Sequence, residues 1–168
     1  MPATYEKIAT TTLGSAVNEI DFSAISGSYT DLRLIFTMNG QSVASGTPFI
    51  RFNLDSGSNY SQTVLAGQGT VAASAQQTNI TKIDLGTYTA PQTSQPTFIT
   101  VDMFSYSNST NKTCLITWSN DYNGGGSTER AVGLYRSTSA ITAIKLKAAS
   151  TNTFNIGTTA TLYGILKA

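Results

Sequence analysis

The sequence predicts an all-β protein with two antiparallel sheets packed face to face in a jelly-roll-like β-sandwich. Apolar and polar residues alternate with period two in several short segments, and clusters of Gly, Asn, Asp and Ser separate these segments. The spacing between successive segments leaves no room for helices. A chain of 168 residues is long enough for one such domain. Its single Cys cannot supply the Cys–Trp–Cys signature of an immunoglobulin domain, which favours the jelly roll.

In the first half of the chain, alternation and bounding turns define each strand. Residues 31–39 place four apolar side chains on one face and end at the turn Asn39-Gly40, and residues 48–54 place three on one face before a turn cluster at 55–59. The other strands here are short runs between turn clusters. The strands expected in this half are Tyr5–Thr12, Val17–Phe22, Asp31–Asn39, Pro48–Leu54 and Tyr60–Leu65.

In the second half, Ile99, Val101 and Met103 fall on one face of a strand, and Ile144 and Leu146 alternate with two lysines. The remaining segments are apolar runs bounded by turns. A short helical turn within 129–138 is the alternative for one of them. The strands expected in this half are Thr78–Leu85, Phe98–Tyr106, Lys112–Trp118, Ala131–Tyr135, Ile144–Lys147 and Thr159–Leu166.

Two loops are expected to be the least ordered parts of the chain. Residues 89–95 contain a proline among Gln, Thr and Ser, and residues 120–128 contain three consecutive glycines. Because loops carry binding in sandwich folds, the candidate partner-contact residues are Pro91, Gln92, Tyr122, Gly124 and Gly125. Residues 1–14 are expected to form an N-terminal arm or first strand, and residues 15–168 the sandwich domain.

The composition argues against catalysis. The chain has no His, one Cys and nine carboxylates, whereas most chemistry near pH 7 needs a group that titrates there, a thiolate, a metal or paired carboxylates. Cys114 lies in an apolar strand, so a buried thiol is expected. A catalytic role for it is not expected, because the chain has no His to lower the pKa of the thiol. We therefore expect a binding or assembly protein, with no enzymatic activity and no cofactor.

Three carboxylate sites have a structural alternative to a chemical role. Glu19 and Asp21 share one strand face and are expected to be solvated rather than a glycosidase dyad. Asp102 has apolar neighbours and is expected to pair with an arginine (Arg33, Arg51 or Arg136). The loop Asp55–Asn59 offers oxygen ligands for calcium but little charge, so a plain hairpin turn is favoured over a metal site.

Charge and hydropathy exclude two further partner classes. The net charge is +1 and the ten basic residues form no run, so nucleic-acid binding is not expected. No apolar stretch approaches the about 20 residues of a membrane helix, and the N-terminus lacks the pattern of a signal peptide. Sugar binding by exposed aromatic side chains remains open, with Tyr122 beside the glycine loop as the main candidate.

Several segments together resemble a known class of proteins. They are Tyr5–Ala9, Ile20–Ile25, Tyr29–Leu34, Arg51–Ser61, Tyr106–Lys112, Gly133–Thr142 and Ala160–Ile165. In this order they resemble small virion structural proteins of tailed bacteriophages, over nearly the full length of the chain. Such β-sandwich modules serve as capsid decoration (cement) proteins or as tail fibre modules, and the family has no catalytic motif to carry over.

The resemblance implies a decoration protein, because the chain has neither the attachment segment nor the repetitive shaft of a fibre. It implies the major capsid protein as partner, self-association as a homotrimer, synthesis in the host cytoplasm and a final location on the outer capsid surface. A tail fibre or receptor- and carbohydrate-binding module is the alternative, with a glycan as ligand.

Overall fold

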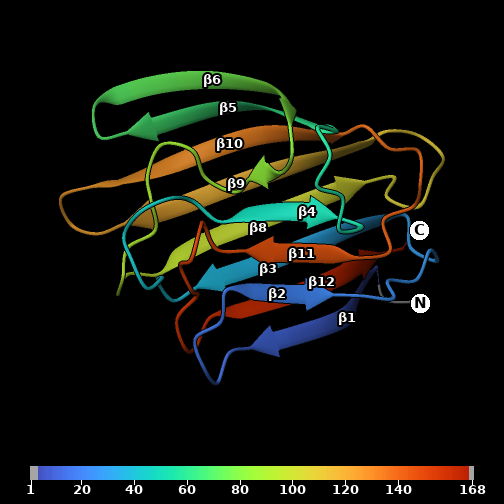
Figure 1. Cartoon of the computed structure of the whole chain (residues 1–168), viewed down its shortest axis with the longest axis horizontal. Coiled ribbons are helices and arrows are strands. Elements are labelled where there is room, and N and C mark those ends of the chain that lie inside the picture. Colours follow the sequence, from blue (N-terminus) through green and yellow to red (C-terminus); the bar gives the residue numbers. More distant parts are fainter. Residues whose placement is uncertain (1–3, 167–168) are drawn as a thin grey trace.

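The computed structural model describes residues 4–166, which form twelve β-strands in two antiparallel sheets and no helix (Figure 1). The all-β sandwich expected from the sequence is confirmed. The strands are β1 (Tyr5–Thr12), β2 (Glu19–Phe22), β3 (Asp31–Met38), β4 (Phe49–Phe52), β5 (Tyr60–Gln68), β6 (Val71–Ile80), β7 (Ile83–Asp84), β8 (Thr97–Phe104), β9 (Lys112–Asp121), β10 (Gly126–Tyr135), β11 (Ile144–Lys147) and β12 (Thr159–Ile165). Within residues 4–166 no helix has the length and hydropathy of a membrane span.

The strand order has the nested pairing of a jelly roll. The larger sheet has eight strands in the order β1-β12-β3-β8-β9-β10-β5-β6, and the smaller has four in the order β2-β11-β4-β7. Pairs β1–β12 and β3–β8 lie in the large sheet, and pairs β2–β11 and β4–β7 lie in the small one. Moving inward from the two ends of the chain, successive pairs therefore alternate between sheets, as they do when a long hairpin is wrapped around a barrel-like core.

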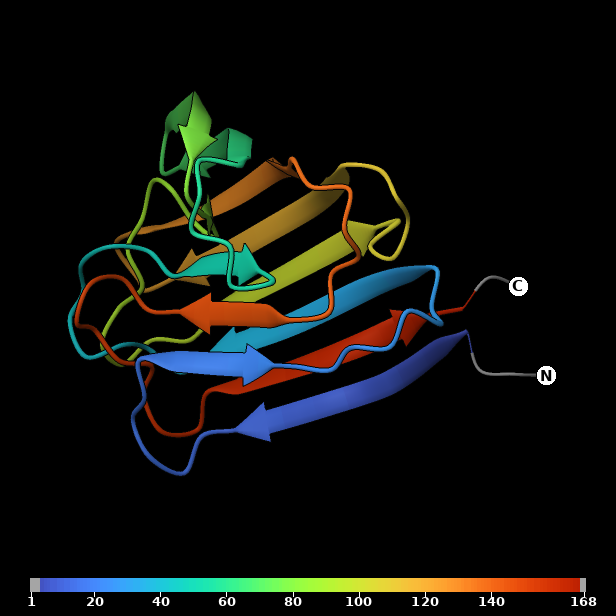
Figure 2. The same ribbon diagram turned by 45° about the vertical axis from the view of Figure 1, so that its right-hand side comes forward.

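Two additional hairpins extend the large sheet beyond this jelly roll. The hairpin β5–β6 is inserted between β4 and β7, and the hairpin β9–β10 is inserted between β8 and β11. They join each other through the β10–β5 pair and continue the large sheet past β8. Figure 2 shows the β5–β6 hairpin at the end of this extension.

The core lies between the inner faces of the two sheets, because strands of both sheets alternate buried and exposed side chains. In β3 every second residue from Leu32 to Met38 is buried, and in β8 every second residue from Thr97 to Met103. Six of the seven largest fully buried side chains among residues 4–166 are aromatic: Trp118, Tyr60, Tyr106, Phe36, Phe52 and Phe154; the seventh is Lys112. One face of the large sheet is thus committed to the core, and the other is left to solvent.

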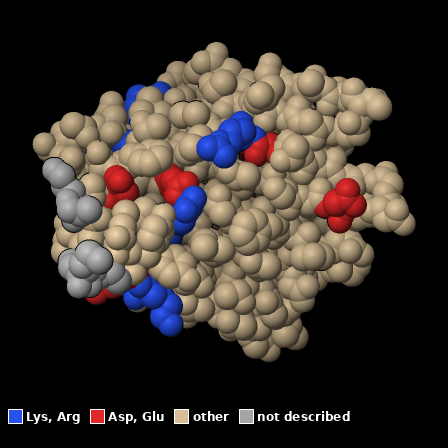
Figure 3. Space-filling view, turned by 180° about the vertical axis from the view of Figure 1, so that it is seen from behind, with Lys and Arg blue, Asp and Glu red and all other residues tan. Residues whose placement is uncertain are grey.

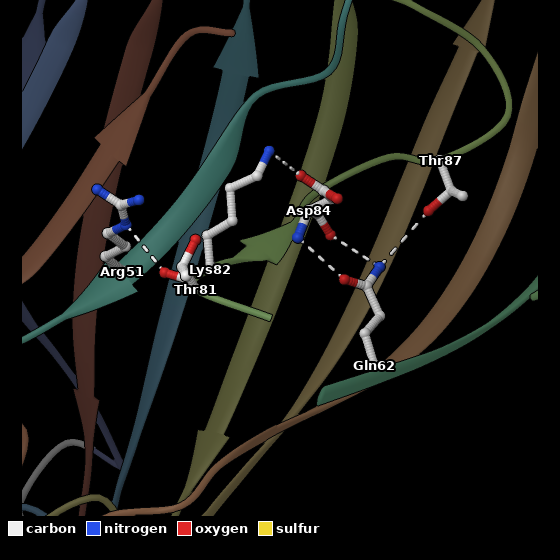
Figure 4. A network of polar contacts seen from close by, with 6 residues as sticks. All are labelled: Arg51, Gln62, Thr81, Lys82, Asp84 and Thr87. Carbon is white, nitrogen blue, oxygen red and sulfur yellow. Dashed lines mark hydrogen bonds and ion pairs between the residues drawn. The ribbon is translucent and has the colours of Figure 1, made fainter. Parts of the chain in front are cut away.

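A polar network closes the sandwich where β5 of the large sheet passes β7 of the small one (Figure 4). The Gln62 side chain accepts a hydrogen bond from the Asp84 N–H (2.9 Å) and donates one to the Asp84 carbonyl (3.0 Å). Lys82 contacts the Asp84 carboxylate at 2.6 Å, and Arg51 donates to the Thr81 carbonyl (3.0 Å). The network fixes the root of the β5–β6 hairpin against both sheets.

One strand prediction was wrong in extent, and the helical alternative to another strand was wrong in kind. The strand predicted at Thr78–Leu85 covers the end of β6, which begins far earlier at Val71, and all of β7, with a bend at residues 81–82 between them. Asn79 has a left-handed backbone (φ 55°) where the register of β6 with β5 shifts. The alternative of a helical turn within 129–138 is also wrong, because β10 runs from Gly126 to Tyr135 and pairs on both sides with β9 and β5.

Candidate functional site

A shallow hollow of about 670 Å³ lies at one end of the large sheet, on the face turned away from the core. The β5–β6 turn, the start of β8 and the β9–β10 turn meet there. It is lined by Gly67, Gly69, Pro96, Phe98, Ser119, Asn120, Asp121, Gly124, Gly125, Gly126, Ser127 and Thr128. We call it the glycine hollow, because five of these twelve residues are glycines.

The hollow forms because one row of outward-facing side chains ends in a glycine. Strand register places Phe98 opposite Ser119, Ser119 opposite Thr128, and Thr128 opposite Gly67. Their side chains stand on the same outer face. Gly67 has no side chain to continue the row, so the surface of the sheet is lower beyond Thr128 and a hollow forms there.

The β9–β10 turn forms the rim of the hollow and needs its glycines. The Tyr122 N–H donates to the Gly125 carbonyl (3.1 Å) and closes the turn. Gly124 and Gly126 have φ values of 129° and 133°, a region that residues with a Cβ rarely adopt. A Cβ on Gly126 would also collide with the Asn120 carbonyl. The low rim therefore follows directly from the glycine run in the sequence.

The chemistry of the hollow combines one aromatic surface with neutral and acidic polar groups. The Phe98 side chain is 47% exposed. Asn120 accepts the Ser127 N–H through Oδ1 (2.9 Å), while its Nδ2 is buried and has no hydrogen-bond partner among residues 4–166. Asp121 accepts the Asn123 N–H through one carboxylate oxygen (3.0 Å), which leaves the other free to accept. An aromatic face beside amide and carboxylate groups suits an uncharged ligand rich in hydroxyls.

The structure brings together only two of the five predicted contact residues. Gly124 and Gly125 line the hollow. Tyr122 does not line it, because its ring packs directly over Gly125 and is half-buried. Pro91 is buried and Gln92 is half-buried, so the 89–95 loop presents Thr93 and its successors to solvent instead.

The loop that holds Pro91 and Gln92 packs against the rest of the protein. The Gln92 carbonyl accepts the Gln41 N–H (3.0 Å), and Gly40 lies so close to this loop that a Cβ would meet the Thr93 carbonyl. Earlier in the connection between β7 and β8, to which this loop belongs, Glu129 of β10 accepts the N–H groups of Thr87 and Tyr88 at 2.8 and 3.0 Å. The connection is therefore a cover for the inner face of β9 and β10.

Phe98 is the residue that reasoning from the sequence missed. It lies on the face of β8 opposite the buried Ile99, Val101 and Met103. A large aromatic side chain on the solvent face of an alternating strand was the available signal.

The carboxylates that could have formed a catalytic pair take part in ion pairs instead. Glu19 and Asp21 lie on the exposed face of β2, and Lys145 of β11 contacts both, at 2.9 and 3.4 Å. The hydrogen bond from Lys145 lowers the pKa of Glu19. A general acid needs a raised pKa, so this shift has the opposite sign from the one that chemistry requires.

The other two carboxylate sites are also engaged structurally. Asp55 accepts hydrogen bonds from the Gly57 N–H (2.7 Å) and the Asn59 side chain (2.9 Å), and these lower its pKa. Asp102 forms an ion pair with Arg33, which is one of the three arginines that the sequence offered as its partner. Among residues 4–166 no three His, Cys, Asp or Glu side chains come together as a metal site would require.

Cys114 is buried and its thiol donates toward the Gly133 carbonyl (3.6 Å). Burial raises the pKa of this thiol to about 12. The thiolate that nucleophilic chemistry needs is therefore scarce at neutral pH.

Comparison of the chain with protein-family models, with curated proteins and with solved structures finds no match.

Proposed function

We propose that this chain is a bacteriophage virion structural protein, a decoration (cement) protein that binds the outer surface of the capsid. The proposal draws on the sequence resemblance to such proteins and on the shape of the large sheet. Its docking surface is the outer face of that sheet, meaning the side turned away from the small sheet.

The observation that carries the proposal is the combination of apolar side chains and few charges on this outer face. Of the nine large hydrophobic side chains exposed among residues 4–166, five lie on it. They are Tyr5, Leu65, Phe98, Phe104 and Val132. Figure 3 views this side of the molecule, where charged groups are few, some lie against a group of opposite charge, and most of the surface is uncharged. Large apolar side chains with few charged residues between them suit a protein interface, whose buried centre is depleted of charged residues.

Four charged side chains on this face are hydrogen-bonded within it, and two of them form an ion pair. Arg33 and Asp102 form an ion pair, and Asp31 accepts the Ser105 N–H (2.7 Å). Arg130 donates to the Thr117 hydroxyl (3.2 Å). Hydrogen bonds to these charged groups reduce the cost of covering them with a shell protein, and the Arg33–Asp102 pair can be covered as a pair.

The mechanism is geometric. Many copies of a rigid sheet, each docked against the major capsid protein at the junctions between shell subunits, add buried area at every junction. Linked copies, such as the homotrimer that the resemblance implies, add avidity because several contacts must break together. A net charge of +1 limits repulsion between crowded copies.

The test uses virions from which the gene for this chain has been deleted. Purified protein is added back, and binding to heads and DNA release on heating are measured. We expect binding to heads and a higher release temperature. Phe104→Asp on the outer face is expected to abolish binding. The control Leu54→Asp makes the same kind of change, from an exposed apolar side chain to a carboxylate, but beside β4 of the small sheet, and should bind normally. Immunogold labelling confined to the tail would rule out the decoration role.

A second candidate function rests on the glycine hollow. Exposed Phe98 beside Asn120 and Asp121 supports a carbohydrate-binding module of the kind found on fibres and receptor-binding proteins. The test is binding of the soluble protein to a glycan array and to host-envelope polysaccharide. Binding that depends on Phe98, without attachment to heads, would favour this function over decoration.

A further inference from the structure

The two edges of the large sheet are built differently. At one edge, β1 carries the exposed charged residues Glu6 and Lys7, and its register with β12 shifts between Lys7 and Ala9. Charges and irregular register are the devices by which proteins keep sheet edges from pairing with other chains. At the other edge, β6 (Val71–Ile80) has ten residues with no charge and no proline. This edge lacks those devices over most of its length.

The backbone of β6 is regular and open along its free side. The hairpin turns through Gly69 and Thr70, with Gly69 at φ 57°, and Val71–Gln77 then pairs residue by residue with β5. In a two-residue hairpin the flanking pair is hydrogen-bonded, and the two kinds of pair alternate along the ladder. The N–H and C=O groups of Ala72, Ser74 and Gln76 therefore point away from β5.

Side chains do not cover this open edge either. From Val71 to Asn79 every residue of β6 is exposed except Ala73 and Ala75, which are half-buried. Figure 1 shows β6 as the outermost strand, with no other element beyond it.

The hairpin is held firmly at its root, so the edge is presented in a fixed position. Arg136 donates to the Ser58 carbonyl (2.5 Å) and to the Asn79 side chain (2.9 Å) at the end of β6. The connection that follows is anchored by Arg51 at Thr81 and by Gln62 at Asp84 (Figure 4). A pre-organised strand loses less conformational entropy when another strand pairs with it.

We propose that β6 pairs with β6 of a second copy of this chain, antiparallel about a two-fold axis. The strand is compatible with itself, because no charge meets a like charge when it faces its own copy. The protected β1 edge is a poor partner, so pairing does not continue head to tail, and an isologous contact closes at two copies. The inference does not depend on the proposed capsid role.

The register follows from the regular part of the strand. The largest overlap of Val71–Gln77 with its own copy is centred on Ser74, so that Ser74 faces Ser74 of the partner copy and Ala72 faces Gln76. Two eight-stranded sheets then become one continuous sheet, and their outer faces lie side by side. A two-fold dimer differs from the three-fold trimer implied by the resemblance, so the oligomer measured in solution separates them.

The first test is the molar mass in solution, measured by light scattering during size exclusion and by sedimentation. We expect twice the 17.8 kDa of one chain. Ser74→Pro removes one outward N–H while keeping the β5–β6 ladder, since proline is tolerated where the N–H faces outward at an edge. It should raise the dimer dissociation constant at least about tenfold, whereas Ser74→Thr, which keeps the N–H, should leave it unchanged. A wild-type monomer or trimer at high micromolar concentration overturns the proposal.

The second test reads the register and remains valid if Ser74→Pro folds poorly. Ser74→Cys is expected to form a disulfide between copies under mild oxidation, because the two Cα atoms would lie within bridging distance, about 5.5 Å. Gln76→Cys, exposed on the same face, places the two thiols about four residues apart along the strands, about 13 Å, and should not cross-link. Equal cross-linking of both variants, or of neither, contradicts the pairing. The buried Cys114 does not compete.

Discussion

Arg33 on β3 and Asp102 on β8 face each other across the outer face of the large sheet in a two-pronged ion pair. The guanidinium Nε lies 2.8 Å from one carboxylate oxygen, and Nη2 donates to the other at 3.1 Å. Strand register places the two residues directly opposite one another. Asp102, the carboxylate that has apolar neighbours in the sequence, thus forms a cross-strand ion pair on the outer face of the sheet.

We predict a modest coupling energy for this pair. The side chains are 35% and 20% exposed, so water screens their attraction. In a double-mutant cycle with Arg33→Met and Asp102→Asn, measured by urea unfolding, the coupling should be about 0.5–1 kcal/mol and should decrease in high salt. A coupling of zero would show that the two-pronged geometry adds nothing to stability.

Lys112 is predicted to matter more for stability than any surface ion pair. Its side chain is buried, and its ammonium donates to the carbonyls of Asn108, Thr110 and Ser137. Lys112→Met leaves these carbonyls without their donor and should lower the free energy of unfolding by about 1–3 kcal/mol. The matched change Lys147→Met, at a half-exposed lysine, should cost less than about 1 kcal/mol. Equal losses in urea denaturation would contradict this role for Lys112.

The Cys114 thiol is predicted to be unreactive in the folded protein. Burial raises its pKa to about 12, so between pH 7 and 9 almost none of it is thiolate and reagents cannot reach it. With a thiol-specific disulfide reagent at pH 8, we expect labelling only after denaturant is added. Rapid stoichiometric labelling of the native protein would mean that β9 opens readily, and would also remove the argument against a nucleophilic role.

Phe98 and Phe104 provide a matched pair for testing the glycine hollow. Both stand on the outer face of β8, with 47% and 43% exposure, but only Phe98 lines the hollow. If the hollow binds a sugar, Phe98→Ala should weaken binding about tenfold or more, on the scale of an aromatic contact, while Phe104→Ala should bind like wild type. The measurement is titration calorimetry with any glycan that responds on the array. Equal effects of the two substitutions would place the ligand elsewhere.

The strands with one buried face could be predicted from the sequence, because burial on one side imposes period two. The alternation in 31–39 and 98–106 corresponds to β3 and β8, whose inner faces meet the core. β6 was missed because both of its faces are exposed, so its sequence of Ala, Ser, Gln and Thr carries no alternation. The strand that gives no signal is the one on which the dimer proposal rests.

The candidate site was only partly predictable for a related reason. The run of three glycines at 124–126 predicts an unusual backbone conformation, and Gly124 and Gly125 do line the hollow. The hollow itself depends on the register that places Phe98, Ser119, Thr128 and Gly67 in one row across four strands. Such pairing joins segments far apart in the chain. Local pattern alone does not determine it. The burial of Pro91 likewise results from tertiary packing of a loop that looked exposed.

The central claim of this account is that the outer face of the large sheet is the surface that docks onto the capsid. A cryo-electron microscopy map of the intact virion, with this domain fitted into the density, tests it most directly. We predict density on the outside of the head, with Phe104 and Val132 turned toward the shell and β4 and β11 turned away from it. Density found only at the tail, or a domain that meets the shell through the small sheet, would contradict the claim.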